Sequence, residues 1–129
     1  MNHKILVVDD EKEMVEVLST TLKRAGYDVD TANNGREALG AYLESLHREP
    51  FSLMTLDIKM TGIDGLEVLE IIRKEEELRG IPLGKGIPII MSTAFATPWP
   101  EAFKKGCDDY ILKPYKMEDL LGKIEDKIK

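Results

Sequence analysis

Cysteine, long hydrophobic runs and clustered positive charge are what this sequence of 129 residues lacks or has little of. The single cysteine, Cys107, cannot form an internal disulfide or a cysteine metal cluster, so we expect a small packed residue there. No apolar run approaches the length of a membrane span, and the N-terminal run is too short for a signal-peptide core. These absences favour a cytoplasmic protein with no membrane insertion.

Negative charge exceeds positive charge, and the positive residues are dispersed along the chain. Lysine and arginine number 18 against 24 acidic residues, which gives a formal net charge of −6. A dispersed minority of cations argues against direct nucleic-acid binding. The charged fraction of 33% and the hydrophobic fraction of 43% are typical of a globular protein. We expect residues 1–129 to form a single domain, with no output domain.

Residues 53–57 form the segment around which the chain is organised. The apolar run LMTL ends abruptly in Asp57, and the turn residues Gly62, Asp64 and Gly65 follow. Such a run is typical of a strand that is buried on both faces of a parallel sheet. Ligands bind at the carboxyl ends of strands in open parallel sheets, which makes Asp57 a candidate site residue. Alternatively, Asp57 caps the following turn.

Four other segments have the pattern of strands: residues 5–8, the alternating edge segment 27–31, and residues 87–91 and 108–112. Helical spacing of apolar residues predicts helices at 11–25, between 35 and 50, at 66–77 and at 117–128. We expect Leu43 on the apolar face of the second helix and the EEE run at 75–77 at the solvated end of the third. Residues 79–86 are rich in glycine and proline and predict a loop. Alternating strands and helices indicate a parallel sheet with helices on both faces.

The carboxyl ends of the expected strands carry a coherent set of polar residues. Asp9 and Asp10 follow the first strand, Asp57 ends the central one, and Thr93 and Lys113 end the fourth and fifth. Three carboxylates so close would repel one another without a cation, and an oxygen-rich cluster suits Mg²⁺. A phosphoryl group at the same edge would explain the other two residues, with Lys113 neutralising its oxygens and Thr93 donating a hydrogen bond.

Each of these residues also has an ordinary structural explanation. Asp9 and Asp10 could cap the first helix, which is compatible with a functional role because the same amides favour anions. Thr93 could be an ordinary strand-end residue, and Lys113 could simply be exposed. Taken singly, these two favour the structural explanation. The combination on four strand ends favours a shared site.

Several stretches closely resemble the response-regulator receiver domain of two-component signalling, in its stand-alone, chemotaxis-regulator-like form. They are ILVVDDE at 5–11, LDIKM at 56–60 with DG at 64–65, MSTA at 91–94 and DYILKP at 109–114. The resemblance covers essentially the whole chain in order. It implies an α/β, flavodoxin-like doubly wound sheet of five parallel strands in the order 2-1-3-4-5, with helices on both faces.

The resemblance also implies roles for individual residues. Asp57 would be the phosphoacceptor, forming an acyl phosphate with Mg²⁺ bound beside it. Asp10 and Asp57 would ligate the metal directly, Asp9 through water, and the backbone carbonyl of Lys59 would be a further ligand. Lys113 would hold a phosphoryl oxygen.

The signalling side of the resemblance involves other residues and partners. Thr93 would swing toward the phosphoryl group, and Tyr110, the switch aromatic, would turn inward behind it. The phosphoryl donor would be a histidine kinase or a histidine phosphotransfer protein. The downstream partner would be an unidentified protein. We expect a monomer or a weak, phosphorylation-dependent dimer. The output would be a change of surface rather than a released product, so the chain would not be a dedicated enzyme.

Some positions depart from the family pattern. Thr61 stands where the family usually has proline, which predicts a slightly looser turn. The two prolines in ATPWP at 96–100 predict a short or irregular fourth helix that begins near Pro100 or Glu101. Trp99 is either a binding anchor or packs over the prolines. The loop 79–86 resembles an insertion. Lys59 and Phe95 flank the expected phosphoryl site, so we expect them to tune the lifetime of the acyl phosphate.

Three other functions fit parts of the pattern. A hydrolase of the haloacid dehalogenase type also uses an aspartate nucleophile with Mg²⁺, but it requires a second aspartate where this chain has Lys59. A flavodoxin-type cofactor binder requires a hydroxyl- and glycine-rich loop where this chain has the acidic run DDE at 9–11. The third is a receiver-like module that binds partners without being phosphorylated.

Overall fold

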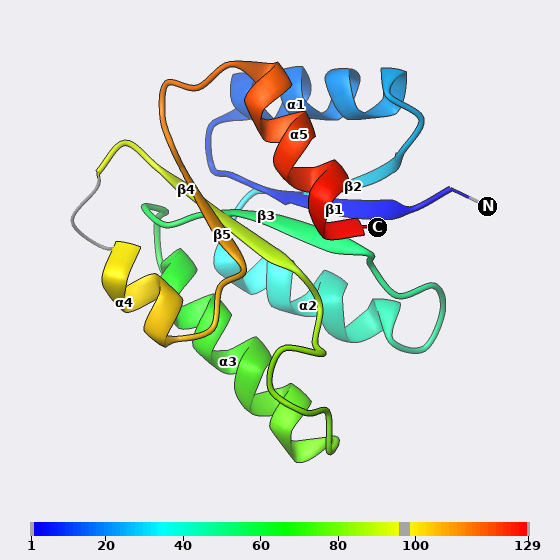
Figure 1. The fold of residues 1–129 in the computed structure, drawn as a ribbon, viewed down its shortest axis with the longest axis vertical. Helices are drawn as coiled ribbons and strands as arrows, with labels where there is room; N and C mark the ends of the chain where they lie inside the picture. Colours follow the sequence, from blue (N-terminus) through cyan, green and yellow to red (C-terminus); the bar gives the residue numbers. More distant parts are fainter. Residues whose placement is uncertain (1, 96–98, 129) are drawn as a thin grey trace.

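Five parallel strands form the single sheet found in the residues that the computed structural model describes, 2–95 and 99–128 (Figure 1). The strands are β1 (Lys4–Val8), β2 (Asp28–Ala32), β3 (Leu53–Asp57), β4 (Ile89–Thr93) and β5 (Asp109–Leu112). Their order, β2-β1-β3-β4-β5, is the predicted one. The helices are α1 (Lys12–Arg24), α2 (Gly35–Ser45), α3 (Gly65–Leu78), α4 (Trp99–Lys104) and α5 (Met117–Ile128). The fold is therefore the expected flavodoxin-like α/β fold.

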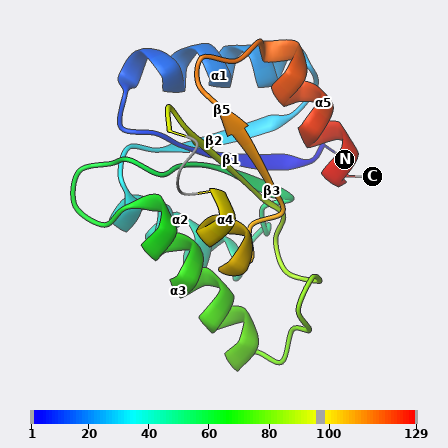
Figure 2. The same ribbon diagram turned by 60° about the vertical axis from the view of Figure 1, so that its left-hand side comes forward.

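The sheet separates two layers of helices, with α1 and α5 on one face and α2, α3 and α4 on the other (Figures 1 and 2). Successive residues of a strand point to opposite faces, so each strand contributes to two apolar cores. Leu53 packs with the core beneath α1 and α5, while Met54 and Leu56 pack with the core beneath α2 and α3. All five residues of β3 are buried, which explains its unbroken apolar run.

Helices α2 and α3 each begin at a side-chain cap. The side chain of Asn34 accepts a hydrogen bond from the N–H of Glu37 at 2.8 Å, and that of Asp64 accepts one from Glu67 at 2.9 Å. Such caps satisfy amides that the first helical turn leaves unpaired. They fix where α2 and α3 begin, next to the carboxyl ends of β2 and β3.

The expected second helix was partly misplaced. It ends at Ser45 rather than at Pro50, and Leu43 is 48% exposed instead of facing the core. Ala38, Tyr42 and Ser45 form the buried face, and Leu43 is turned away from it because one residue rotates a helix by about 100°. Tyr42, rather than Leu43, therefore faces the core.

The start of the fourth strand also differs from the prediction. The apolar pattern begins at Ile87, whereas β4 begins at Ile89. Pro88 has no N–H and cannot donate to the sheet, although its carbonyl accepts a hydrogen bond from Met54 at 2.9 Å. The strand extends to Thr93, so the last residue of β4 lies at the functional edge.

Helix α4 is six residues long, which confirms the short helix expected from the prolines. It begins at Trp99, one residue earlier than predicted, and Ala96, Thr97 and Pro98 lie outside the described residues. Trp99 is 50% exposed and meets the ring of Phe103 edge-on, with centroids 6.0 Å apart.

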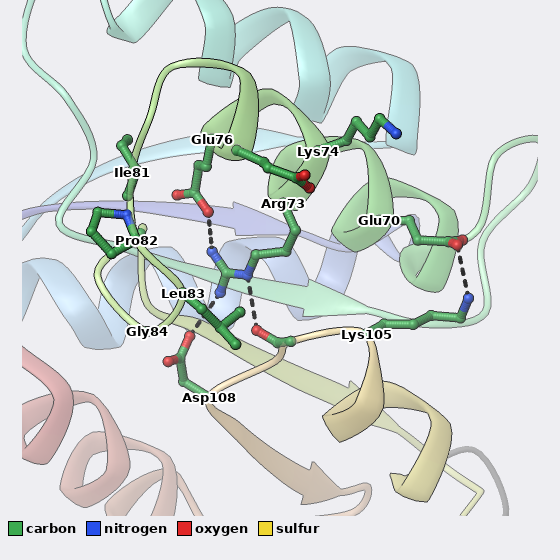
Figure 3. A pocket seen from close by; sticks show the side chains of 13 residues that line it. Glu70, Arg73, Lys74, Glu76, Ile81, Pro82, Leu83, Gly84, Lys105 and Asp108 are labelled. Carbon is green, nitrogen blue, oxygen red and sulfur yellow. Dashed lines mark hydrogen bonds and ion pairs between the residues drawn. The ribbon is translucent and has the colours of Figure 1, made fainter.

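Glu76 overturns the prediction of a solvated helix end, because it is only 4% exposed (Figure 3). Its carboxylate accepts hydrogen bonds from Arg73 and from the N–H of Ile87, both at 2.7 Å. Arg73 also donates to Asp108 and to the carbonyl of Gly106, each at 2.9 Å. These contacts tie the loop 79–86 and the turn before β5 to α3. Arg73, Glu76, Gly106 and Asp108 are among the residues that line a hollow of about 440 Å³ beside the start of β5.

A search for membrane-spanning helices in residues 2–95 and 99–128 finds none that combines the required length and apolar character.

Candidate functional site

Three aspartates converge at the carboxyl ends of β1 and β3. These strands are neighbours, with Val8 paired to Leu56, so the acids that follow each strand come together. One carboxylate oxygen from each of Asp9, Asp10 and Asp57 lies within 4.8 Å of the other two. Asp9 is 2% and Asp57 4% exposed, whereas Asp10 faces solvent. The edge therefore holds two buried acids and one accessible acid.

Lys113 reaches this cluster from β5, two strands away from β3. Its ammonium lies 2.8 Å from a carboxylate oxygen of Asp9 and 3.6 Å from one of Asp57. The backbone N–H of Lys113 donates to the carbonyl of Thr93 at 2.8 Å, which fixes where the side chain starts. Contacts of its backbone and its side chain thus fix Lys113 in the cluster, and it is not simply an exposed residue before proline.

The electrostatics of the cluster favour a bound cation. Burial raises the pKa of Asp57 to about 6, Lys113 opposes this increase, and the charges of Asp9 and Asp10 add to it. Burial lowers the pKa of Lys113, but its hydrogen bond to Asp9 and the charge of Asp57 outweigh this and raise the pKa, so the lysine is a cation. The cluster combines three aspartates with this one ammonium, so a bound cation would be stabilised there.

The donor set of this cluster suits Mg²⁺. The three side chains offer carboxylate oxygens, which hard divalent cations prefer. The cluster contains neither histidine nor cysteine, the ligands typical of zinc sites. Asp10 and Asp57 stay the predicted direct ligands, and Asp9 the ligand predicted to act through water. The backbone carbonyl of Lys59, two residues after Asp57, stays a predicted ligand.

Thr93 and Tyr110 both contact the backbone of Phe95. The hydroxyl oxygen of Thr93 accepts a hydrogen bond from the Phe95 N–H at 3.4 Å, and the Tyr110 hydroxyl donates to the Phe95 carbonyl at 2.6 Å. Thr93 is buried, whereas the tyrosine hydroxyl lies near the surface. The structure therefore connects the two residues predicted to carry the signal through Phe95, which is itself predicted to tune the lifetime of the acyl phosphate.

Lys59 and Phe95 form a bridge between the loop after β3 and the loop after β4. The Lys59 ammonium lies 5.5 Å from the centre of the Phe95 ring, a distance at which a cation and an aromatic face attract each other. Both side chains are exposed. Lys59 lies two residues after Asp57 and Phe95 two residues after Thr93. Their effect on the lifetime of the acyl phosphate stays a prediction.

Backbone donors at the site were not visible in the sequence pattern. The N–H of Glu11 donates to Asp9 at 2.9 Å, and the N–H of Thr61 donates to Asp10 at 3.3 Å. Nearly every residue carries an N–H, so only the loop conformation decides which of them faces a carboxylate.

Gly65 lets the loop after β3 close against the strand end. Its N–H donates to the carbonyl of Ile58 at 2.8 Å. A Cβ at this position would overlap the carbonyl oxygen of Asp57 and lie 2.8 Å from the Cα of Ile58. Both obstacles are backbone atoms, which cannot rotate away as a side chain can.

We therefore expect Gly65→Ala to lower the free energy of unfolding by about 1–3 kcal/mol through overpacking. Gly40→Ala in α2 is the matched control, because a Cβ there meets nothing within 4 Å and alanine favours a helix. Urea denaturation of both variants measures the difference. A Gly65→Ala protein as stable as the wild type would show that the loop does not need this close approach.

Comparisons with known proteins agree with this site. The family model described as the response regulator receiver domain matches residues 5–125. A CheY-like receiver domain protein from Methanospirillum hungatei is 32% identical with a TM-score of 0.81, covering 99% of this chain and 94% of that one. TrrA of Thermotoga maritima, solved in complex with Mg(2+)-BeF, is 34% identical with a TM-score of 0.78, covering 97% and 98%.

The chemotaxis protein CheY4 of Vibrio cholerae is a further similar structure, with 28% identity, a TM-score of 0.80 and 98% of each chain covered. The family model spans well over half of the sequence, and the similar structures share its fold along nearly their whole length. The chain belongs to the response regulator receiver domain family.

Proposed function

We propose that this receiver accepts a phosphoryl group on Asp57, in a reaction that depends on Mg²⁺, from a histidine kinase or a histidine phosphotransfer protein. The observation that carries the proposal is the position of Asp57. It is buried at a strand end, with Asp9 and Asp10 beside it and the Lys113 ammonium 3.6 Å away. A carboxylate, a cation-binding cluster and a fixed ammonium are the groups that phosphoryl transfer to an acid requires.

The proposed transfer is a displacement at phosphorus. A carboxylate oxygen of Asp57 attacks, a new P–O bond forms, and the P–N bond to the donor imidazole breaks. The electron pair of that bond leaves with the imidazole nitrogen, which takes a proton from water. Lys113 neutralises a phosphoryl oxygen, and bound Mg²⁺ would supply further positive charge there. The pKa of Asp57, about 6, leaves its carboxylate ionised and nucleophilic at neutral pH.

The phosphoryl group would then be read through Thr93. The Thr93 hydroxyl would donate a hydrogen bond to a phosphoryl oxygen, and moving toward it would draw the hydroxyl oxygen away from the Phe95 N–H. The Tyr110 hydroxyl donates a hydrogen bond to the carbonyl of the same residue, Phe95. Rearrangement at Phe95 would free Tyr110 to turn inward. The consequence is a changed surface near α4 and β5, which a downstream protein or a second copy recognises.

Family membership sets aside the dehalogenase-type hydrolase and the flavodoxin-type cofactor binder as readings of the whole chain. A receiver that binds partners without phosphorylation is the alternative that experiment must decide. The protein would be incubated with acetyl phosphate and Mg²⁺, and its intact mass measured. We expect one phosphoryl adduct in the wild type and in Asp30→Asn, an exposed acid on β2, and none in Asp57→Asn or in EDTA. Absence of an adduct in folded wild type would contradict the proposal for small donors. Incubation with a histidine kinase and ATP would then test the proposed protein donor, and absence of an adduct there as well would contradict phosphorylation altogether.

We expect the bridge between Lys59 and Phe95 to prolong the lifetime of the acyl phosphate. It joins the loops that follow Asp57 and Thr93, and we expect it to restrict the approach of water to the acyl phosphate. Removing either partner should therefore speed hydrolysis by about two- to fivefold, the rate equivalent of a cation–π contact of 0.5–1 kcal/mol. We expect Lys59→Ala, Phe95→Ala and the double variant to have similar rates, because each breaks the same contact. The decay of the phosphoprotein mass after removal of the donor measures this. Rates equal to that of the wild type would refute the prediction.

A further inference from the structure

Asp10 is the member of the acidic cluster that burial does not hold in place. Asp9 is buried and accepts hydrogen bonds from Lys113 at 2.8 Å and from the Glu11 N–H at 2.9 Å. Asp57 is buried with the Lys113 ammonium 3.6 Å away. Asp10 is exposed, and an exposed aspartate samples several rotamers unless a contact selects one.

Thr61 supplies that contact from the other side of the site. Its backbone N–H donates to a carboxylate oxygen of Asp10 at 3.3 Å, across 51 residues of sequence. In the described part of the chain this is the hydrogen bond found for the Asp10 side chain. It joins the loop after β1 to the loop after β3, which are the two loops that carry the acids.

The position of this donor is itself fixed by the strand that carries Asp57. Gly65 donates to the carbonyl of Ile58 at 2.8 Å, and Asp64 caps α3, so the loop is closed on both sides of Thr61. With the contact in place, a carboxylate oxygen of Asp10 lies within 4.8 Å of those of Asp9 and Asp57. The side chain is thus held in an orientation that already converges on a cation.

We propose that the backbone N–H of Thr61 is a positioning group that sets the Mg²⁺ affinity of this receiver by holding Asp10 toward the other two aspartates. The inference rests on the proposed function of the acidic cluster. Hydrogen bonds to metal ligands orient them and reduce the ordering that binding must impose. The threonine side chain plays no part, so every residue except proline can supply the donor.

The sequence predicts only a looser turn from Thr61 in place of proline, whereas the proposed role depends on a backbone donor that proline lacks. Proline at this position would leave Asp10 without the contact. The chain therefore has a donor that a proline-containing turn lacks, placed on the accessible metal ligand.

The test compares two substitutions at one position. Mg²⁺ would be titrated calorimetrically into wild type, Thr61→Ala and Thr61→Pro, without any phosphodonor. Thr61→Ala keeps the N–H and should match the wild type, whereas Thr61→Pro should bind Mg²⁺ about three- to tenfold more weakly, the effect of one hydrogen bond. Equal affinity in Thr61→Pro, or an equal loss in Thr61→Ala, would overturn the inference while leaving the proposed function intact. A wild type that binds no Mg²⁺ would overturn the proposed function as well.

A second measurement covers the case in which Thr61→Pro does not fold. In ¹⁵N-labelled protein, Asp10→Ala should move the amide proton of Thr61 upfield and speed its exchange with solvent, because its acceptor is gone. The amide of Gly65, which donates to the Ile58 carbonyl, is the internal control and should not change. An unchanged Thr61 amide would overturn the inference.

Discussion

Asp57→Asn is expected to raise the free energy of unfolding of the metal-free protein by about 3 kcal/mol at pH 7.5, although it removes the proposed phosphoacceptor. The fold raises the pKa of Asp57 from 3.8 to about 6, chiefly through burial. The native state therefore binds a proton more tightly than the unfolded state does. Ionising this carboxyl costs stability, at about 1.4 kcal/mol for each pKa unit. Asparagine has no charge to bury.

The pH dependence gives this prediction its sign. Well below its unfolded-state pKa of 3.8, Asp57 is protonated in both states and the cost is absent; the cost grows between that pKa and the folded-state pKa of about 6 and is complete above it. Guanidinium denaturation in EDTA should thus show Asp57→Asn more stable than the wild type at pH 7.5 and nearly equal to it at pH 4. Asp30→Asn, on the exposed edge of the sheet, should show no such trend. A variant less stable than the wild type at pH 7.5 would mean that ionisation of the buried Asp57 carboxyl does not cost stability.

Lys113→Met is expected to have the opposite effect, lowering the free energy of unfolding by about 3–5 kcal/mol at pH 7.5. Methionine keeps much of the apolar stem but removes the ammonium that lies 2.8 Å from Asp9 and 3.6 Å from Asp57. Loss of one partner leaves a buried charge uncompensated, which costs about this much. The raised pKa of Lys113 means that its contribution is fully present at neutral pH and is lost only as the pH rises through that value.

The loss should be partly relieved by acid and by a second substitution. Without the ammonium, the pKa of Asp57 rises further, so lowering the pH from 7.5 toward 5 should narrow the gap to the wild type. Adding Asp57→Asn should do the same at pH 7.5, a coupling that a double-mutant cycle measures. Lys123→Met is the control, because its pair with Asp109 is partly exposed and should be worth less than about 1 kcal/mol. Equal losses in Lys113→Met and Lys123→Met would contradict a special role for Lys113.

The fold was predictable because the strands differ so clearly from the helices. Residues 53–57 are apolar up to a terminal acid, and β3 is buried along its whole length. Glu76 was not predictable in the same way. Its neighbours Glu75 and Glu77 give it the local pattern of a solvated helix end, and its burial depends on Arg73 and on the backbone of a loop that no spacing rule describes.

The site was predictable in its residue types but not in its connections. Topology alone brings Asp9 beside Asp57, because β1 and β3 are neighbours. The contacts from Thr61 to Asp10 and from Tyr110 to Phe95 use backbone atoms, whose direction depends on loop conformation. A sequence shows which side chains can act at a strand end, while the structure shows which amides and carbonyls hold them.

Locating the phosphoryl group on the chain tests the central claim most directly. After reaction with acetyl phosphate and Mg²⁺, borohydride reduces an aspartyl phosphate to homoserine, which tandem mass spectrometry assigns to a residue. We predict homoserine at position 57 in the wild type, dependent on Mg²⁺. Homoserine at another aspartate, or a phosphoryl adduct that leaves residue 57 unmodified, would contradict the assignment of Asp57 as the phosphoacceptor.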